Sequence, residues 1–139
     1  MHEINSTLEQ VKEWNKNTMV EHLGIEITDV GPGFLAGKMP VDHRTHQPMG
    51  LLHGGASVAL AETLASIGAA LQVDLSKKDC VGLEINANHL KGVREGWVYG
   101  KATAIHTGKR TQVWETKIIN EAGELVCISR MTVAIIDKK

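Results

Sequence analysis

The longest stretch of apolar positions in the chain predicts one central helix. Residues 56–71 read ASVALAETLASIGAAL, and the stretch from Leu51 to Val73 is long enough to span about 30 Å of hydrocarbon at ~1.5 Å per residue. A membrane span is nevertheless unfavourable, because Glu62 at its centre would cost roughly 2.5–3.5 kcal/mol on insertion and the alanines and glycines add little apolar gain. We therefore predict a buried helix of a soluble protein, from about Leu52 to Val73.

The first fifty residues predict a helix, a hairpin and a loop. Apolar residues recur on one helical stripe over residues 6–17, and Ser6 with Glu9 has the spacing of a capping box. The segments GIEITDV and FLAGKMP read as short strands on either side of a Gly-Pro-Gly turn. The polar, proline-containing stretch that follows, residues 40–50, predicts an irregular loop that leads into the central helix.

After the central helix the apolar pattern changes to the period of two that is typical of β-strands. Val81, Leu83, Ile85 and Ala87 fall on one face of the first such strand, and the polar residues among them fall on the other. Glycine-containing turns separate three more strands, WVYGKATAI, TQVWETKII and LVCISRMTVAII. One long helix and about six strands, joined as an antiparallel meander, predict an α+β fold in which the sheet curls round the helix.

Composition and charge narrow the class of protein. The chain has 139 residues, which fits one domain over 1–139 with residues 1–18 as an N-terminal helical extension. The net charge of −1 and the mixing of basic with acidic residues give no basic face for nucleic acid. The N-terminus lacks the basic start and apolar run of a secretory signal, so we expect a cytoplasmic protein that does not bind a membrane.

Neither the cysteines nor the histidines form a redox or metal-binding pattern. Cys80 and Cys127 lie far apart and form no C-x-x-C pair, so we interpret both as small buried hydrophobic residues. His43, His46 and His53 lie close together, but no H-E-x-x-H or Cys/His set accompanies them. We therefore predict that the protein binds no metal ion.

Glu62 is the most informative residue of the central helix, because no other acid or base lies between Arg44 and Asp74 except His46 and His53. Ser66 lies one turn further on the same helix face, and the small residues around it leave room for a ligand or a second backbone. A carboxylate beside a ligand site is one interpretation. The alternative is a partly wet helix edge at which Glu62 pairs with a lysine, because unpaired buried carboxylates are costly.

The residues just before the helix favour a ligand site. In QPMGLLHGGAS, Gln47 and His53 precede a Gly54-Gly55 pair at the helix start, where free backbone N–H groups and the helix dipole attract a carbonyl oxygen or oxyanion. Together with a carboxylate, this set suits attack on an acyl carbonyl. Taken singly, each has a simpler explanation: Gln47 as a loop residue, His53 as a helix cap and the glycines as parts of a turn.

The spacing of His53 and Glu62 restricts how they can act together. Nine residues of helix correspond to about 13.5 Å along the axis and about half a turn of phase. One chain therefore cannot easily bring both residues to one substrate. If both belong to a site, Glu62 must come from a second subunit across a two-fold axis, which predicts a dimer with two equivalent sites.

Two segments, QPMGLLHGGASVALAET and VGLEINANHLK, resemble the hotdog-fold acyl-CoA thioesterases of the phenylacetic-acid-degradation (PaaI-like) group. Within that group the sequence is most similar to the 1,4-dihydroxy-2-naphthoyl-CoA hydrolases and the enterobactin-synthesis proofreading thioesterases. The likeness runs from about Met19 to Ile136. It implies a central helix wrapped by an antiparallel sheet, pairing into dimers with a continuous sheet, and usually assembly into dimers of dimers.

The resemblance also implies roles for individual residues. Glu62 is the expected catalytic carboxylate, as nucleophile or as general base on water. Gln47 and His53 are expected to position the thioester, and the Gly54 N–H to hold its oxygen. Ser66 is expected to help orient the water. Three segments are expected to contact coenzyme A: Gly82; His89, Leu90, Lys91 and Gly92; and His106, Thr107, Gly108, Lys109, Arg110 and Thr111. By charge alone the last segment is a candidate phosphate clamp, although such a Gly-Lys-Arg turn is also typical of a solvated loop.

We therefore expect a thioester hydrolase that acts on an aromatic acyl-CoA and needs no cofactor, since coenzyme A is part of the substrate. Apolar candidates for lining an acyl pocket are Met49, Leu51, Val58 and Leu60. Two alternatives stay open: a non-catalytic acyl-CoA sensor or scaffold on the same fold, and an acyl-thioester hydratase or dehydratase.

Overall fold

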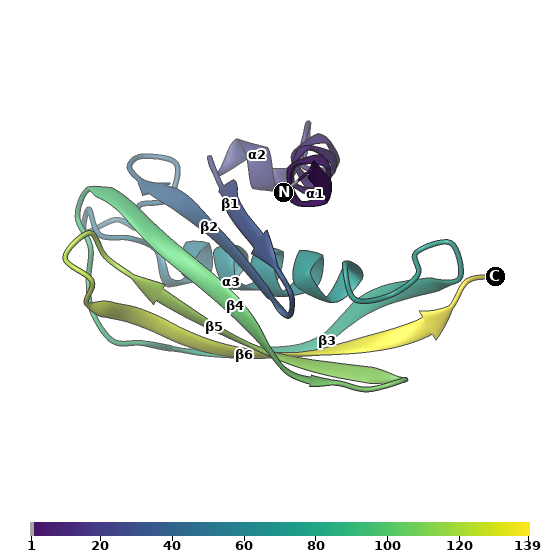
Figure 1. Ribbon diagram of the computed structural model, residues 1–139. Helices are drawn as coiled ribbons and strands as arrows, with labels where there is room; N and C mark the ends of the chain where they lie inside the picture. The colour runs from purple at the N-terminus through teal and green to yellow at the C-terminus, as the bar shows by residue number, and fades with distance from the viewer. Residues whose placement is uncertain (1) are drawn as a thin grey trace.

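The computed structural model describes residues 2–139, with side chains from Thr7 onward. Its elements are α1 (His2–Trp14), α2 (Met19–His22), β1 (Glu26–Gly31), β2 (Phe34–Val41), α3 (Gly54–Ala70), β3 (Lys78–His89), β4 (Gly96–Thr107), β5 (Thr111–Ile119) and β6 (Leu125–Asp137). The six strands form one antiparallel sheet in the order β1-β2-β4-β5-β6-β3. The sheet curves round α3, while α1 and α2 lie near its β1 edge (Figure 1). The predicted α+β class is confirmed.

Small residues let α3 lie close to the sheet. The buried face of the helix carries Leu60, Leu64 and several alanines. A methyl group added at Gly37 of β2 or Gly100 of β4 would come within 2.9 or 2.8 Å of the Leu64 side chain, so a larger residue there would force the helix away from the strands. The helix that carries Glu62 is therefore held against β2 and β4. None of the helices in the described chain is long and apolar enough to cross a bilayer.

The central helix is shorter than predicted at both ends. It begins at Gly54 rather than Leu52, because His53 has an extended backbone and is the N-cap. It ends at Ala70 rather than Val73, and the residues after it form turns. An apolar pattern continues through both boundaries, which is why hydrophobicity alone overestimated the length of the helix.

The first helix is displaced toward the N-terminus relative to its predicted range of 6–17. It ends at Trp14, and three residues later Asn17 has a φ of 59°, in the left-handed region that asparagine tolerates and that helices do not continue through. The predicted capping box depends on the side chain of Ser6, which lies outside the described residues.

The first hairpin is confirmed, since β1 and β2 pair on either side of the glycine-proline-glycine turn. The loop after it begins two residues later than predicted, because Pro40 and Val41 continue β2 and pair with β4. The pairing of β1 with β2 reaches only to Lys38. Beyond that point β2 has a neighbour on one side only, and a proline is tolerated there because no N–H is needed on the open side.

β3 departs from the predicted alternation at one residue. Gly82 and Glu84 are two residues apart, but their partners on β6 are adjacent, so Leu83 is the extra residue of a β-bulge. One extra residue exchanges the two faces of the strand on one side of the bulge. Val81 and Leu83 are consequently 44% and 61% exposed, and the prediction that they share the inner face with Ile85 is wrong.

β3 also lies elsewhere in the sheet than a simple meander predicts. The strands β4, β5 and β6 do form consecutive hairpins, but β3 pairs with β6 rather than with β4. The connection after β3 must therefore pass two strands, β6 and β5, before β4 begins. This order places β3 at an edge of the sheet, and its outer side has no partner strand in the described chain.

Candidate active site

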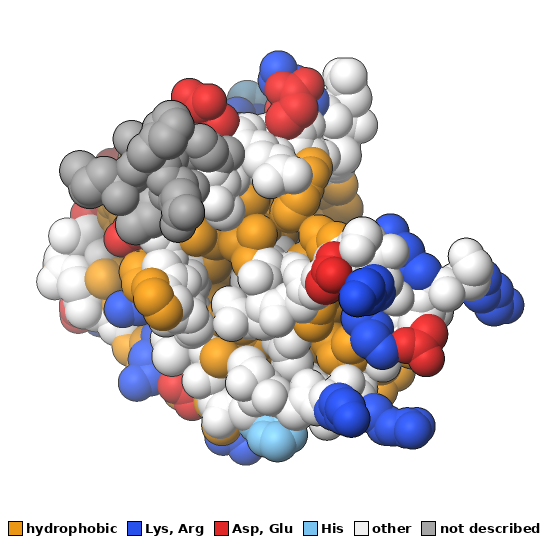
Figure 2. Space-filling view, turned by 45° about the vertical axis from the view of Figure 1, so that its right-hand side comes forward, with side chains coloured by type: hydrophobic (Ala, Val, Ile, Leu, Met, Phe, Trp, Pro, Cys, Tyr) orange, Lys and Arg blue, Asp and Glu red, His pale blue; other side chains and the backbone are white. Residues whose placement is uncertain are grey.

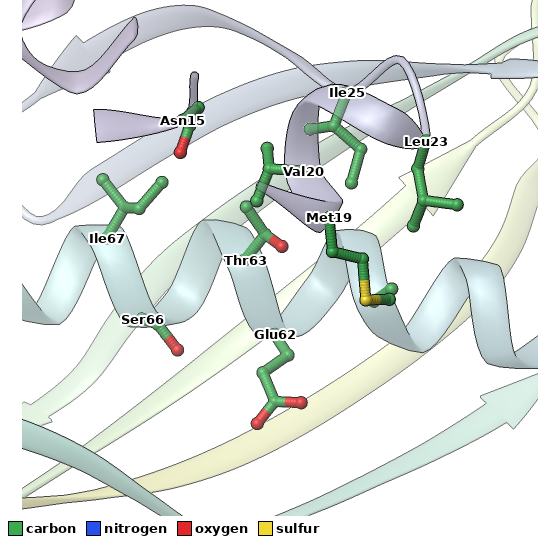
Figure 3. Close-up of a pocket in the computed structure, with 10 residues that line it drawn as sticks. Asn15, Met19, Val20, Leu23, Ile25, Glu62, Thr63, Ser66 and Ile67 are labelled. Carbon is green, nitrogen blue, oxygen red and sulfur yellow. The ribbon is translucent and has the colours of Figure 1, made fainter. Parts of the chain in front are cut away.

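The Glu62 carboxylate projects from the middle of α3 toward β3. Its Oε2 atom is 3.3 Å from the position that a Cβ would occupy at Gly82, so the glycine leaves space for the carboxylate. Ser66 points to the same side of the helix one turn further on (Figure 3), where its hydroxyl donates to the Met131 sulfur at 3.9 Å. Glu62 is exposed, which agrees with the wet helix edge of the alternative interpretation. No ion pair among the described side chains includes it, however, so the lysine partner of that interpretation is absent among them.

A pocket of about 390 Å³ opens beside this carboxylate. One wall comes from α3, and the other comes from the segment that contains the end of α1, α2 and the start of β1 (Figure 3). The lining residues are Asn15, Met19, Val20, Leu23, Ile25, Ala59, Glu62, Thr63, Ser66 and Ile67. We call this cavity the acyl pocket. It joins one carboxylate to a mostly apolar space, as expected for a site that cleaves an apolar acyl group from a carrier.

The apolar residues predicted to line a pocket do not line this one. Leu60 is fully buried in the core, and Met49 is 74% exposed on the loop. Leu51 lines a different cavity, and Val58 lines neither of the two cavities at the candidate site. The residues that do line the acyl pocket come partly from the N-terminal segment, whose packing on α3 no local sequence pattern indicates.

His53 caps α3, which is the simpler of the two explanations considered for it. Its Nδ1 accepts a hydrogen bond from the Gly55 N–H at 2.8 Å. This bond places the hydrogen of the neutral ring on Nε2, so the exposed imidazole offers a donor to solvent or to a ligand. Among the hydrogen bonds of the described residues, none uses the Gly54 N–H. The helix therefore starts with a free backbone donor at its positive end.

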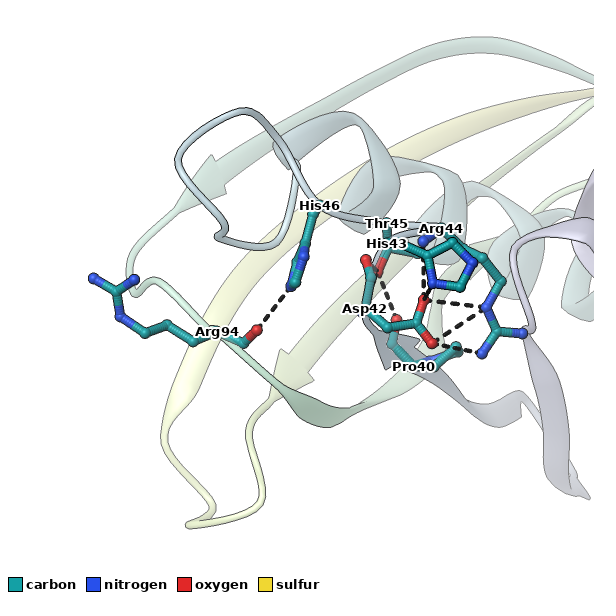
Figure 4. A network of polar contacts seen from close by, with 7 residues as sticks. All are labelled: Pro40, Asp42, His43, Arg44, Thr45, His46 and Arg94. Atoms are coloured by element: carbon teal, nitrogen blue, oxygen red, sulfur yellow. Dashed lines mark hydrogen bonds and ion pairs between the residues drawn. The ribbon is translucent and has the colours of Figure 1, made fainter.

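Hydrogen bonds hold the loop before α3 (Figure 4), and a further one fixes the side chain of Gln47. The buried Thr45 hydroxyl donates to the Pro40 carbonyl oxygen at 2.7 Å, and His46 Nε2 lies 2.7 Å from the carbonyl oxygen of Arg94. The Gln47 side-chain oxygen accepts from the backbone of its own loop, at the Met49 N–H. Sequence reasoning missed Thr45 and His46 as supports, because a polar loop residue shows no periodic sign of burial.

A surface ion pair lies at the start of the same loop. Arg44 donates to both carboxylate oxygens of Asp42, with 2.7 Å between Nη2 and Oδ2, and its backbone N–H donates to Oδ1 at 2.9 Å. These hydrogen bonds lower the pKa of Asp42 to about 2. Both side chains are more than a third exposed, so the pair shapes the turn and does not form part of a buried site.

A second cavity, of about 380 Å³, lies at the N-terminal end of α3, and we call it the loop groove. It brings Gln47 and Gly54 together with four of the residues expected to contact coenzyme A: His89, Leu90, Lys91 and Gly92. A methyl group at Gly54 would come within 2.9 Å of His89 Nε2, so only glycine lets the ring lie this close to the helix start. Lys91 pairs with Glu124, with 2.8 Å between Nζ and Oε2.

The acyl pocket and the loop groove are separate cavities within one chain. The acyl pocket contains Glu62 and Ser66, the loop groove contains Gln47 and Gly54, and no residue lines both cavities. Gly82, the remaining single residue expected to contact coenzyme A, lies with Glu62 and not with the loop groove.

The turn from His106 to Thr111 lies at a third location. Thr111 pairs with Ala134 of β6, whereas His89 pairs with Cys127, seven residues away on the same strand. At ~3.4 Å per residue the turn is roughly 24 Å from the loop groove, near the end of the sheet where the chain ends (Figure 1). Lysine and arginine side chains gather on this side of the molecule (Figure 2). Within the turn, Lys109 and Arg110 are exposed.

A curved antiparallel sheet wrapped round one central helix is the hotdog fold. The model of the thioesterase superfamily matches residues 49–127, and the chain therefore belongs to the thioesterase superfamily. The matched range begins just after Gln47 and includes α3 and most of the sheet.

Individual relatives agree with this assignment. The 1,4-dihydroxy-2-naphthoyl-CoA hydrolase of Escherichia coli is 48% identical over 130 residues, which cover 94% of this chain and 95% of that protein. A proofreading thioesterase of Cronobacter turicensis is 47% identical over 129 residues, 93% of each chain. The crystal structure of a mutant thioesterase from Pseudomonas aeruginosa has a TM-score of 0.92 at 48% identity, covering 94% of both chains. The predicted resemblance, the hotdog fold and the class of thioester hydrolase are confirmed.

Proposed function

We propose that the protein hydrolyses acyl-CoA thioesters with an aromatic acyl group, and that Glu62 is the catalytic carboxylate. The observation that carries the proposal is the position of Glu62, at the edge of an apolar pocket, opposite a glycine and without an ion-pair partner among the described residues. The relatives support the substrate class, because one of them is named as a hydrolase of an aromatic acyl-CoA.

Each active site would be built by two chains. Glu62 and the acyl pocket would come from one subunit. The other subunit would supply Gln47 and Gly54 of its loop groove, together with the helix-capping His53 beside them. β3 suits such an assembly, since it is a 12-residue edge strand with exposed Val81 and Leu83. Pairing of β3 with β3 of a second copy would continue the sheet through a two-fold axis and produce two equivalent sites. Assembly of two such dimers into a tetramer is part of the same proposal.

In this arrangement the thioester oxygen would accept a hydrogen bond from the Gly54 N–H at the positive end of α3. The Gln47 amide and the His53 Nε2–H are two further donors at that position. As charge develops on the oxygen, a fixed donor of this kind contributes a factor of about 10²–10³ in rate. Thioesters have a good thiolate leaving group, so neither a metal ion nor a strong base is required.

Glu62 would supply the remaining chemistry in one of two ways. As a general base it takes a proton from water while the water oxygen bonds to the carbonyl carbon; the C–S bond then breaks and the thiolate of coenzyme A leaves and is protonated. As a nucleophile it forms a mixed anhydride and releases the thiolate first, and water then cleaves the anhydride. Ser66, one turn away on the same face, is placed to orient the water in either case.

Thiol release from a panel of aromatic, short-chain and long-chain acyl-CoA esters tests the proposal. We expect Glu62→Gln to lower the rate by about 10²–10⁴. Glu13→Gln is the matched control, because it makes the same change in an exposed glutamate that pairs with Lys16 on the surface. Binding of acyl-CoA without turnover by the intact protein would instead favour a sensor, and an active Glu62→Gln variant would exclude the assigned carboxylate.

A further inference from the structure

The acyl pocket adjoins another, larger cavity. This outer cavity has a volume of about 610 Å³ and lies between α1, the first hairpin and the start of β4. Only two residues, Asn15 and Ile25, line both cavities. Figure 3 shows both of them on the side of the acyl pocket that lies across from Glu62. They are therefore placed as a partition between the acyl pocket and the space beyond it.

The two cavities differ in chemistry. On the side away from Glu62 and Ser66, the acyl pocket is lined mainly by aliphatic side chains. The outer cavity instead contains five charged residues, Lys12, Glu21, Glu26, Lys38 and Arg44. A partition at this position would keep the acyl group on the apolar side.

The partition is held in place by its neighbours. The Thr18 hydroxyl donates to the Asn15 carbonyl oxygen at 2.6 Å, and Val11, one turn earlier in α1, is fully buried in the core. Ile25 is only 6% exposed, and its N–H donates to the Val20 carbonyl oxygen at 3.1 Å. Ile25 is therefore packed in place, whereas Asn15 is half-buried and is held through its backbone carbonyl.

We propose that Asn15 and Ile25 form the end wall of the acyl pocket and limit the length of the acyl group that the enzyme accepts. The proposal rests on the proposed function, because it takes the acyl group to extend from Glu62 into this pocket. It assigns a role in substrate selection to the residues that directly follow α1 and directly precede β1.

The test measures kcat/KM for straight-chain substrates from butyryl-CoA to dodecanoyl-CoA, and for benzoyl-CoA. Asn15→Ala and Ile25→Ala would each open the partition, and Ile25→Val is a milder variant in case Ile25→Ala does not fold. Leu8→Ala is the matched control, since Leu8 lines only the outer cavity. Thermal unfolding of each variant checks that α1 stays packed.

We expect the ratio of kcat/KM for dodecanoyl-CoA to that for butyryl-CoA to rise about 10- to 100-fold in the wall variants, and to stay unchanged in the control. An unchanged ratio in folded wall variants, or an equal rise in Leu8→Ala, would overturn the end wall. If the end wall is overturned in this way but Glu62→Gln still abolishes turnover, the proposed thioesterase function stands. Absence of turnover with every substrate would overturn both.

Discussion

A mixture of two inactive variants tests whether the active site is shared between chains. Glu62→Gln removes the carboxylate from the acyl pocket, and Gln47→Ala removes the amide from the loop groove. Since no residue lines both cavities of one chain, each variant dimer would carry one damaged half in both of its sites. Each variant alone should therefore be inactive, and Glu62→Gln should fall by about 10²–10⁴.

The expected recovery follows from the geometry. In a mixed dimer, one site receives both damaged halves and the other receives neither, so one site of two is intact. Random association of equal amounts gives about half mixed dimers, and the mixture should reach about a quarter of wild-type activity. That value is far above the sum of the separate variants.

The assay is thiol release after the two variants are unfolded together in denaturant and refolded. The control is wild type mixed in the same way with the double variant, which carries both Glu62→Gln and Gln47→Ala. Every mixed dimer of the control has two damaged sites, so activity should drop to about a quarter of the wild-type value. A shared site would be refuted if the mixture of the two single variants showed no recovery and the mixture of wild type with the double variant kept about half of the wild-type activity. That result would place the whole site within one chain.

Two further predictions concern stability. Gly68→Ala should lower the free energy of unfolding by about 1–3 kcal/mol, because the added methyl would come within 2.8 Å of the buried Trp114 ring; an unchanged denaturation midpoint would contradict this packing. The pKa of Asp42 is lowered by Arg44 to about 2, so the stabilisation is fully present above the unfolded value of 3.8 and is lost as the pH falls through about 2. Asp42→Asn should accordingly be about 0.2–1 kcal/mol less stable than wild type near neutral pH. Thermal unfolding at a series of pH values should show this difference constant down to about pH 3.8 and shrinking between that value and about pH 2.

The sequence predicted those parts of the fold that depend on local patterns. Short-range signals mark each of these elements. Turn residues mark the first hairpin and the three hairpin-linked strands at the C-terminal end, and a long run of apolar residues marks the central helix. The pairing of β3 with β6 was not predictable in this way, because the two strands are separated by β4 and β5 and no turn joins them. The helix boundaries were imprecise because apolar residues continue past both ends of α3.

The candidate site was predicted in composition more than in arrangement. Three residues stand out in the sequence: Gln47 just before an apolar helix, Gly54 at its start and Glu62, a charged residue, in its middle. The separation of these residues into two cavities agrees with the distance of about 13.5 Å along the helix axis that the spacing of His53 and Glu62 already implied. The acyl pocket itself was not predictable, since its outer wall is an N-terminal segment that reaches α3 only through tertiary packing.

The bulge at Leu83 decides which side chain stands opposite the carboxylate. With Leu83 as the extra residue, Gly82 turns its face to α3 and leaves room for Glu62. If Leu83 instead took part in the regular alternation, Leu83 and Val81 would turn inward and Gly82 would turn outward. A branched side chain would then occupy the space beside the carboxylate. The bulge, and not the spacing of residues along the sequence alone, therefore places a glycine opposite the carboxylate and keeps the branched residues of this strand away from it.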